Sequence, residues 1–328
     1  MNLRRSVLIV VLLLPVLVAC SPTRPGSGSQ VSVALDWYPN SDHAGLYMAR
    51  EQGYFTAQGL NVNLYTPSNP DDVLKLVGTG KATFGVSYEP DLLLARSQGI
   101  PVVSIAALVQ HPLNSVITLQ SSGITHPGQL AGKNVGTPGL AGDEALLATM
   151  LEKDGSSLDK VHLVNVGFDL VPALVSKKVD AIVGGYWTHE AIMVTQQSGP
   201  VNVMHVEQWG VPDYYELVLV ASEDTVKNQP ALVQHFVDAV VQGYGAAIAN
   251  PTAALDAVQK NYTEMDRQME TVGIQDLVPL FKGNQPKPGW QTADRWQSYE
   301  QWMEQRKLLT KAVDPNAAFT NQFVAAAP

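Results

Sequence analysis

The sequence predicts an α/β protein with two lobes, each a mainly parallel sheet flanked by helices. Three observations predict this class. With 328 residues the chain is long for a single compact core, so two lobes are expected. Hydrophobic residues make up 45% and charged residues 16%, which is typical of a well-packed soluble body rather than a disordered chain. Short apolar runs alternate with helix-like runs, and this alternation favours parallel strands joined by helices.

The first cycle of this alternation precedes a long polar stretch, SSGITHPGQLAGK. Its predicted strands are short apolar runs such as VSVALD and PVVSIAALV. These strands span 31–36, 61–65, 82–87 and 101–109. The runs between them predict helices at 45–52, 71–77 and 90–98.

A second cycle follows the polar stretch. Its predicted strands lie at 134–138, 161–166, 180–185 and 201–206. Two helices are predicted between them, at 143–151 and 171–176. The same alternation therefore predicts a second sheet covered by helices.

A final strand, ELVLVA (216–221), precedes a tail that is helical throughout. Pro230 stands in the first turn of its first helix, a position that tolerates proline. The apolar stripe of that helix comprises Leu232, Val233, Phe236, Val237, Val240, Val241 and Tyr244. We expect the chain to cross between lobes near 119–123 and to return near 216–222. Lobe I is then 31–120 and 221–328, and lobe II is 121–220.

The N-terminus, MNLRRSVLIVVLLLPVLVAC, has the pattern of a secretory signal over residues 1–19. Its apolar run is short for a membrane span, although an uncleaved anchor is the alternative. Cys20 is the only cysteine, which excludes a disulfide within the chain and a cysteine-based metal site. The stretch LVAC resembles the lipobox of bacterial lipoproteins, which implies lipidation of Cys20. Residues 20–30 would form a flexible tether, holding the protein at the extracytoplasmic face of the cell membrane.

The charge balance bears on the choice of partner. The formal net charge is -9, and removing residues 1–19 takes away Arg4 and Arg5, which gives -11 (-9 minus 2). An acidic chain without a cluster of Lys or Arg is a poor candidate for binding nucleic acid.

Aromatic side chains stand beside amide or carboxyl groups at four predicted strand ends. The residues that we single out there are Trp37 and Asn40, then Tyr88, then Tyr186, Trp187 and Glu190, and finally Trp209 and Tyr214. Ligands of open α/β sheets lie beyond the carboxyl ends of the strands. Rings that stack and a few hydrogen-bonding groups are what a flat heteroaromatic ligand requires.

Structural roles are the alternatives at each of these positions. Trp37, Tyr186 and Trp187 could be core aromatics, and Trp209 and Tyr214 could pack between the lobes. Glu190 stands at a predicted helix start, where a carboxylate also stabilises the helix dipole. His43 is a further candidate, with ligand hydrogen bonding, turn capping and metal binding as its three possible roles.

Two motifs that would indicate an enzyme are incomplete. GTGKAT (78–83) lacks the first glycine and the final Ser/Thr of a phosphate-binding loop. GVSYE (85–89) ends in Glu89 where a nucleophile elbow requires glycine. No catalytic constellation, cofactor site or metal site is therefore predicted.

Several stretches taken together resemble the NMT1/THI-type branch of the periplasmic binding proteins. They are LDWYPNSDHAGLYMAREQGYF, GKATFGVSYEPDLLLARSQGIPVVSIAALVQHPLNS, VGFDLVPALVSKKVDAIVGGYWTHEA and WGVPDYYELVLV. The resemblance implies a hinged, two-lobed type II binding fold that presents its ligand to an ABC permease, with the ATPase on a separate chain. The ligand-contacting positions carried over are Trp37, Asn40, Tyr88, Tyr186, Trp187 and Glu190.

The resemblance leaves two vitamins as candidate ligands. Family members bind either riboflavin or a formylaminopyrimidine of thiamine salvage. Aromatics at four strand ends favour a wide tricyclic ring, so we expect riboflavin, with the thiamine pyrimidine precursor as the alternative. A branch of eukaryotic pyrimidine synthases carries a cysteine-rich motif that this chain lacks, and we expect a binding protein rather than an enzyme.

Overall fold

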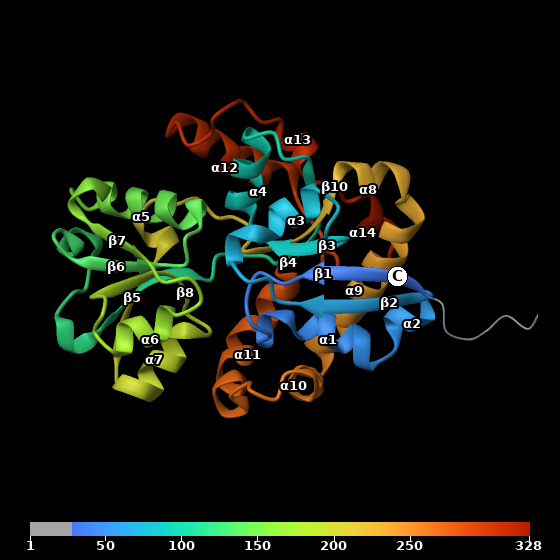
Figure 1. Ribbon diagram of the computed structural model, residues 1–328, viewed down its shortest axis with the longest axis horizontal. Helices are drawn as coiled ribbons and strands as arrows, with labels where there is room; N and C mark the ends of the chain where they lie inside the picture. The colour runs from blue at the N-terminus through green and yellow to red at the C-terminus, as the bar shows by residue number, and fades with distance from the viewer. Residues whose placement is uncertain (1–27) are drawn as a thin grey trace, which may run out of the picture.

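The structure is a computed structural model that describes residues 28–328, so the predicted signal peptide and Cys20 lie outside the described residues. Two five-stranded sheets lie side by side with helices around them (Figure 1). The first sheet has, in spatial order, β2 (Leu60–Tyr65), β1 (Ser29–Ala34), β3 (Phe84–Ser87), β10 (Leu217–Ser222) and β4 (Val102–Val109). The second sheet has, in spatial order, β7 (His162–Asn165), β6 (Asn134–Thr137), β8 (Ala181–Tyr186), β5 (Asn114–Leu119) and β9 (Val201–His205).

Each sheet contains one strand that runs against the others. In the first sheet β10 is antiparallel to both of its neighbours, β3 and β4. In the second sheet β5 is antiparallel to β8 and to β9. All other strands of each sheet run in one direction. The predicted α/β class with two mainly parallel sheets is therefore confirmed, and the two reversed strands are those that begin where the chain changes sheets.

The crossings occur earlier in the chain than expected. Strand β5 was not predicted, and it belongs to the second sheet, whereas the expected lobe I extended to residue 120. All six residues of β5 are buried, so no alternation of polar and apolar residues marks it as a strand. Following sheet membership, we assign 28–109 and 217–328 to lobe I and 114–209 to lobe II. The crossing segments are then 110–113 and 210–216.

Helices cover both sheets, and most of them belong to lobe I. Those of lobe I are α1 (Ala44–Glu51), α2 (Tyr54–Ala57), α3 (Val73–Gly78), α4 (Glu89–Ser97), α8 (Glu223–Asn228), α9 (Pro230–Ala249), α10 (Pro251–Asn261), α11 (Arg267–Lys282), α12 (Ala293–Gln305), α13 (Pro315–Ala318) and α14 (Gln322–Ala326). Those of lobe II are α5 (Ala141–Lys153), α6 (Leu170–Val175) and α7 (Glu190–Ser198). Short 3-10 turns are η1 (Ser41–His43), η2 (Pro70–Asp72), η3 (Gln120–Ser122), η4 (Pro127–Leu130), η5 (Leu158–Lys160) and η6 (Val206–Trp209).

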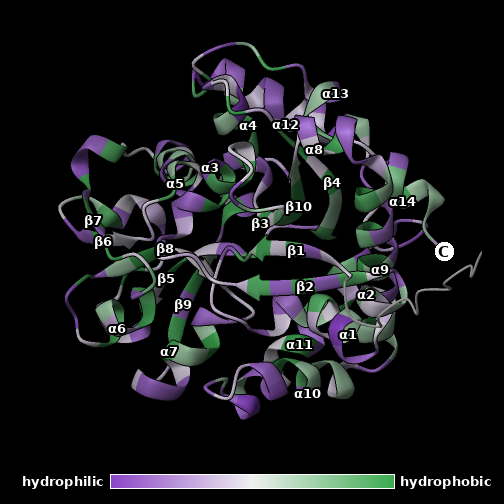
Figure 2. Ribbon diagram, turned by 45° about the vertical axis from the view of Figure 1, so that its right-hand side comes forward, coloured by the Kyte–Doolittle hydropathy of each residue, from purple (hydrophilic) through white to green (hydrophobic). Residues whose placement is uncertain are grey.

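The core of lobe I is centred on the long helix α9, which begins at Pro230 as predicted. Phe236 on its buried face stacks on Phe84 of β3, with ring centroids 4.2 Å apart, and on Phe55 of α2 at 5.4 Å. The strands carry the apolar residues that face the core, with hydrophilic residues between them in β1 and β2, and hydrophilic residues also lie on the outer turns of helices such as α7 and α10 (Figure 2). Burial of these apolar faces is the main force that holds each layer in place.

Helices α1 and α9 approach each other closely at two glycines. A Cβ atom at Gly243 would lie 2.1 Å from the carbonyl oxygen of Gly45. A Cβ atom at Gly45 would lie 2.2 Å from the ring of Tyr244. The helices can therefore keep this contact only because neither position carries a side chain.

The two lobes touch along their shared boundary. The rings of Trp37 and Phe168 lie 4.6 Å apart, and the backbone N–H of Gly142 donates to Asp91 at 3.1 Å. Within residues 28–328, no helix combines the length and the apolar character that a membrane span requires.

Candidate functional site

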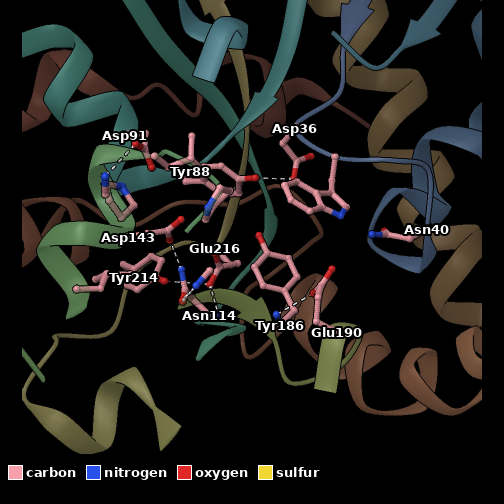
Figure 3. Close-up of a pocket in the computed structure, with 17 residues that line it drawn as sticks. Asp36, Asn40, Tyr88, Asp91, Asn114, Asp143, Tyr186, Glu190, Tyr214 and Glu216 are labelled. Atoms are coloured by element: carbon pink, nitrogen blue, oxygen red, sulfur yellow. Dashed lines mark hydrogen bonds between the residues drawn. The ribbon is translucent and has the colours of Figure 1, made fainter. Parts of the chain in front are cut away.

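A cavity lies between the two lobes, at the ends of strands from both sheets, and its empty space is about 480 Å³ when the part open to solvent is included. Its walls come from lobe I, from lobe II and from the second crossing segment. Lobe I contributes Asp36, Trp37, Asn40, Tyr88, Pro90 and Asp91. Lobe II contributes Asn114, Pro138, Leu140, Gly142, Asp143, Leu146, Gly184, Tyr186 and Glu190, and the crossing segment contributes Tyr214 and Glu216. Figure 3 shows the labelled side chains arranged around this space.

Trp37 and Asn40 follow β1 and occupy the lobe I side of the cavity. Trp37 is half-buried, and its edge meets the ring of Phe168 from lobe II at an interplanar angle of 62°. The side-chain oxygen of Asn40 accepts from the N–H of Asp42 at 2.8 Å and caps the turn η1. The amide nitrogen of Asn40 is then left on the side that faces the cavity (Figure 3).

Tyr88 is held in place by a buried hydrogen-bond chain. Its hydroxyl donates to Asp36 at 2.9 Å, and the other oxygen of Asp36 lies 2.9 Å from Nε2 of His43. Nδ1 of His43 accepts from the backbone N–H of Asn40 at 3.4 Å. His43 is fully buried and does not line the cavity. Of the three roles predicted for His43, its contacts in the structure are those of turn capping. It also holds the carboxyl group of Asp36 in place.

Tyr186 and Glu190 form the lobe II side, at the end of β8 and the start of α7. The carboxylate of Glu190 accepts from the backbone N–H of Tyr186 at 2.9 Å, which closes the turn between them. The hydroxyl of Tyr186 points into the cavity (Figure 3). It makes no hydrogen bond of full geometry among residues 28–328, and it lies near the carboxyl group of Glu216, where it partly offsets the rise in pKa that burial causes.

Trp187 and Trp209 do not line the cavity. Trp187 begins the turn after β8, and its ring lies beside that of His205, with centroids 5.7 Å apart. The indole N–H of Trp187 donates to the carbonyl of Pro112 at 3.3 Å. Trp209 packs on the core beside α5, whereas Tyr214 lines the cavity and donates to Glu216 at 3.0 Å.

Four carboxyl groups of the wall were not among the predicted site residues: Asp36, Asp91, Asp143 and Glu216. Glu216 joins the two crossing segments, because one of its oxygens accepts from the N–H groups of Leu113 and Asn114 and from the hydroxyl of Tyr214. Burial raises the pKa of Glu216 to about 7 and that of Asp91 to about 6. Burial, followed by the nearby charge of Asp91, raises the pKa of Asp143 well above its usual range.

The kinds of charged side chain in the lining determine which ligands the cavity can bind. Its lining includes five carboxyl groups, counting Glu190, and no Lys or Arg. Across residues 28–328 no group of three His, Cys, Asp or Glu side chains is placed to hold a metal ion. The cavity thus offers rings for stacking and an excess of hydrogen-bond acceptors to a flat polar molecule that donates hydrogen bonds.

The chain is similar to proteins of one family along nearly its whole length. The family model described as NMT1/THI5 like matches residues 40–254. The formylaminopyrimidine-binding protein of Halalkalibacterium halodurans is 35% identical, covering 97% of this chain and 99% of that protein. The riboflavin-binding protein RibY of Chloroflexus aurantiacus is 27% identical, with 97% and 96% covered. A 4-amino-5-hydroxymethyl-2-methylpyrimidine phosphate synthase of Saccharomyces cerevisiae is 26% identical, with 70% of each chain covered.

Solved structures with the same fold include periplasmic binding proteins. The alkanesulfonate-binding protein SsuA from Xanthomonas axonopodis pv. citri superposes with a TM-score of 0.71 at 13% identity, covering 90% of this chain and 99% of that one. The periplasmic aliphatic sulphonate binding protein SsuA from Escherichia coli gives a TM-score of 0.68 at 12% identity, with 88% and 91% covered. The chain therefore belongs to the NMT1/THI5-like family and has the two-lobed fold of the periplasmic solute-binding proteins.

Proposed function

We propose that this protein captures an aminopyrimidine of the formylaminopyrimidine type outside the cytoplasm and delivers it to an ABC permease. The observation that carries the proposal is the cavity between the lobes, which is walled by aromatic rings and five carboxyl groups and has no Lys or Arg in its lining. The protein binds its ligand without chemical change, and the ATPase is a separate chain. Lipidation of Cys20 would keep the protein at the membrane.

The polarity of the cavity distinguishes between the two ligands considered. An aminopyrimidine carries an amino group that donates two hydrogen bonds, and its ring can stack on Trp37 or Tyr186. The pyrimidine edge of an isoalloxazine carries two carbonyl oxygens and a single N–H, so it presents mostly acceptors. A carbonyl oxygen of the isoalloxazine can bond only to those carboxyl groups that are protonated, whereas an amino group can donate to a carboxyl group in either state. The formylaminopyrimidine-binding relative, at 35% identity, supports the same choice.

Riboflavin, which we expect from the sequence, is the second candidate. The observation in its favour is a neighbouring cavity of about 820 Å³ that shares Trp37 and Glu190 with the first. Phe168 and Tyr262 are among its lining residues, and it could receive part of a wide ring system or its side chain.

Titration of the purified protein with each ligand tests the proposal. We expect formylaminopyrimidine to bind tightly and riboflavin to bind at least about tenfold more weakly, a difference of about 1.4 kcal/mol. Heat released on mixing, or quenching of tryptophan fluorescence, measures both affinities. Tighter binding of riboflavin would reverse the assignment, and binding of neither would refute the proposal.

Trp37 provides a test of the stacking surface. Replacing it with alanine removes a ring from the cavity wall, and we expect binding to weaken by about 1–3 kcal/mol, the usual loss for an aromatic residue that stacks on a base. Trp187→Ala is the matched control, because that indole is also half-buried and lies outside the cavity. Equal losses in both variants would show that Trp37 acts only on stability.

A further inference from the structure

Asp143, in the wall of the cavity, is a buried acid with only one of its two carboxyl oxygens hydrogen-bonded. It lies in the first turn of α5, and its side chain is only 5% exposed. One of its oxygens accepts from the side-chain amide of Asn114. The other oxygen is buried and has no hydrogen-bond partner among residues 28–328.

The surroundings fix this orientation. The side-chain oxygen of Asn114 accepts from the N–H of Gly184 at 3.2 Å, so its amide nitrogen is the atom that faces Asp143. Asn114 is itself anchored, because its backbone N–H donates to Glu216 at 2.9 Å. Gly184 has φ of +89°, and a Cβ atom there would lie 2.7 Å from the free oxygen of Asp143. The glycine therefore leaves the space that the acid occupies.

The remaining neighbours do not supply the missing donor. Asp91, on the facing lobe, is a second acid that accepts from the N–H of Gly142. No Lys or Arg lines the cavity, so none of the lining side chains offsets a negative charge on Asp143. A buried acceptor without a donor is costly, and a ligand that brings the donor removes that cost.

We propose that Asp143 contacts the ligand and sets its specificity, by binding the amino group and the adjacent ring nitrogen of the aminopyrimidine. This inference rests on the proposed function. The ring nitrogen beside an amino group is basic and can hold a proton, whereas the corresponding nitrogen of an oxopyrimidine is not basic. Because burial favours the protonated form of Asp143, the proton of its carboxyl group can pass to the ring nitrogen when the aminopyrimidine binds. The ring then presents two N–H donors and a positive charge to the carboxylate, which an oxopyrimidine cannot do. Asn114 is the positioning residue that aims the acid.

The test compares two ligands that differ at one group: the aminopyrimidine and its analogue with an oxo group in place of the amino group. In the unaltered protein we expect the amino form to bind at least about a hundredfold more tightly. In Asp143→Asn we expect this ratio to fall by about tenfold or more, the loss typical of one charge-assisted hydrogen bond. Glu144→Gln is the control, because it removes a charge from the same helical turn at an exposed position and should leave the ratio unchanged.

A second measurement needs no variant, in case Asp143→Asn does not fold. The ultraviolet difference spectrum of the aminopyrimidine bound to the unaltered protein should be that of the protonated ring at neutral pH. A neutral-ring spectrum, or a ratio that survives in a folded Asp143→Asn, would overturn the inference while the proposed function stands. Failure of the unaltered protein to bind the aminopyrimidine at all would instead refute the proposed function, and this inference with it.

Discussion

Replacing Glu270 with alanine is expected to destabilise the closed arrangement of the lobes by about 3–5 kcal/mol, because the change breaks a buried ion pair. Glu270 lies on α11 of lobe I, and one of its oxygens is 3.0 Å from Nε2 of His189 in lobe II. Its other oxygen accepts from the N–H of Ser41 at 3.0 Å. Nδ1 of His189 lies 2.9 Å from Glu190, which lines the ligand cavity. The pair therefore connects the cavity wall to the opposite lobe.

Ligand affinity measures this effect, since a protein that stays open cannot enclose its ligand. We expect the dissociation constant of Glu270→Ala to rise by about a hundredfold or more. Small-angle X-ray scattering with ligand present should show a wider molecule than the unaltered protein. Asp276→Ala is the control, because it removes an exposed carboxylate from the same helix. Affinity unchanged in Glu270→Ala would contradict a role for this pair in closure.

The pH dependence of closure follows from the same pair. Burial lowers the pKa of His189, but Glu190 and Glu270 outweigh it and raise that pKa well above 6.5. The stabilisation that protonated His189 gives to the contact between the lobes is then complete below pH 6.5, and it is lost as the pH rises through the raised pKa. Burial alone would raise the pKa of Glu270, but His189 outweighs burial and lowers that pKa below 4.5. The stabilisation from ionised Glu270 is therefore lost as the pH falls through the lowered pKa. Ligand binding should therefore weaken as the solution becomes alkaline. In Glu270→Ala this weakening should begin at a lower pH than in the unaltered protein, because His189 has lost one of the carboxylates that raise its pKa.

Replacing Gly243 with alanine is expected to destabilise the whole fold by about 3 kcal/mol, toward the upper end of the cost of overpacking. The added methyl group would overlap the carbonyl oxygen of Gly45, which is backbone and cannot rotate away. Helices α1 and α9 would have to separate, which opens gaps in the core around Phe236.

Gly245, two residues along the same helix, is the matched control. A Cβ atom at Gly245 would meet no atom within 4 Å. Gly245→Ala should therefore stabilise the protein by about 0.4–1 kcal/mol, since alanine favours the helix and restricts the unfolded chain. Urea unfolding of both variants measures the two changes. If Gly243→Ala also stabilised the protein, the close contact between these helices would not contribute to the free energy of unfolding.

The alternation of strands and helices, and several of the residues that line the cavity, could be predicted from the sequence. Trp37, Asn40, Tyr88, Tyr186 and Glu190 all follow strand ends, and strand ends of both sheets meet at the cavity. Local pattern and the known geometry of parallel sheets indicated these strand ends. The family resemblance then selected the individual ligand-contacting positions among them.

The remaining parts of the site depend on long-range pairing. Strand β5 is buried on both faces and mixes polar with apolar residues, so its sequence carries no period, and only pairing with β8 and β9 identifies it. Asp143 stands at the start of a predicted helix, where an acid ordinarily needs no further explanation. Its importance arises from Asn114, which is brought to it by β5. Trp187 was placed in the site because it follows a predicted strand and because of the family resemblance, and in the structure it does not line the cavity.

The order of the strands has a consequence for biosynthesis. Strand β10 lies between β3 and β4, yet the ribosome makes it only after the entire inserted lobe. The inserted lobe is one continuous segment, so it can finish folding while the N-terminal part still lacks an interior strand. Until β10 arrives, β3 and β4 expose unpaired backbone edges to the solvent and to neighbouring chains. A polypeptide released with its end just before Leu217 would thus contain one completed lobe and one that is prone to aggregate.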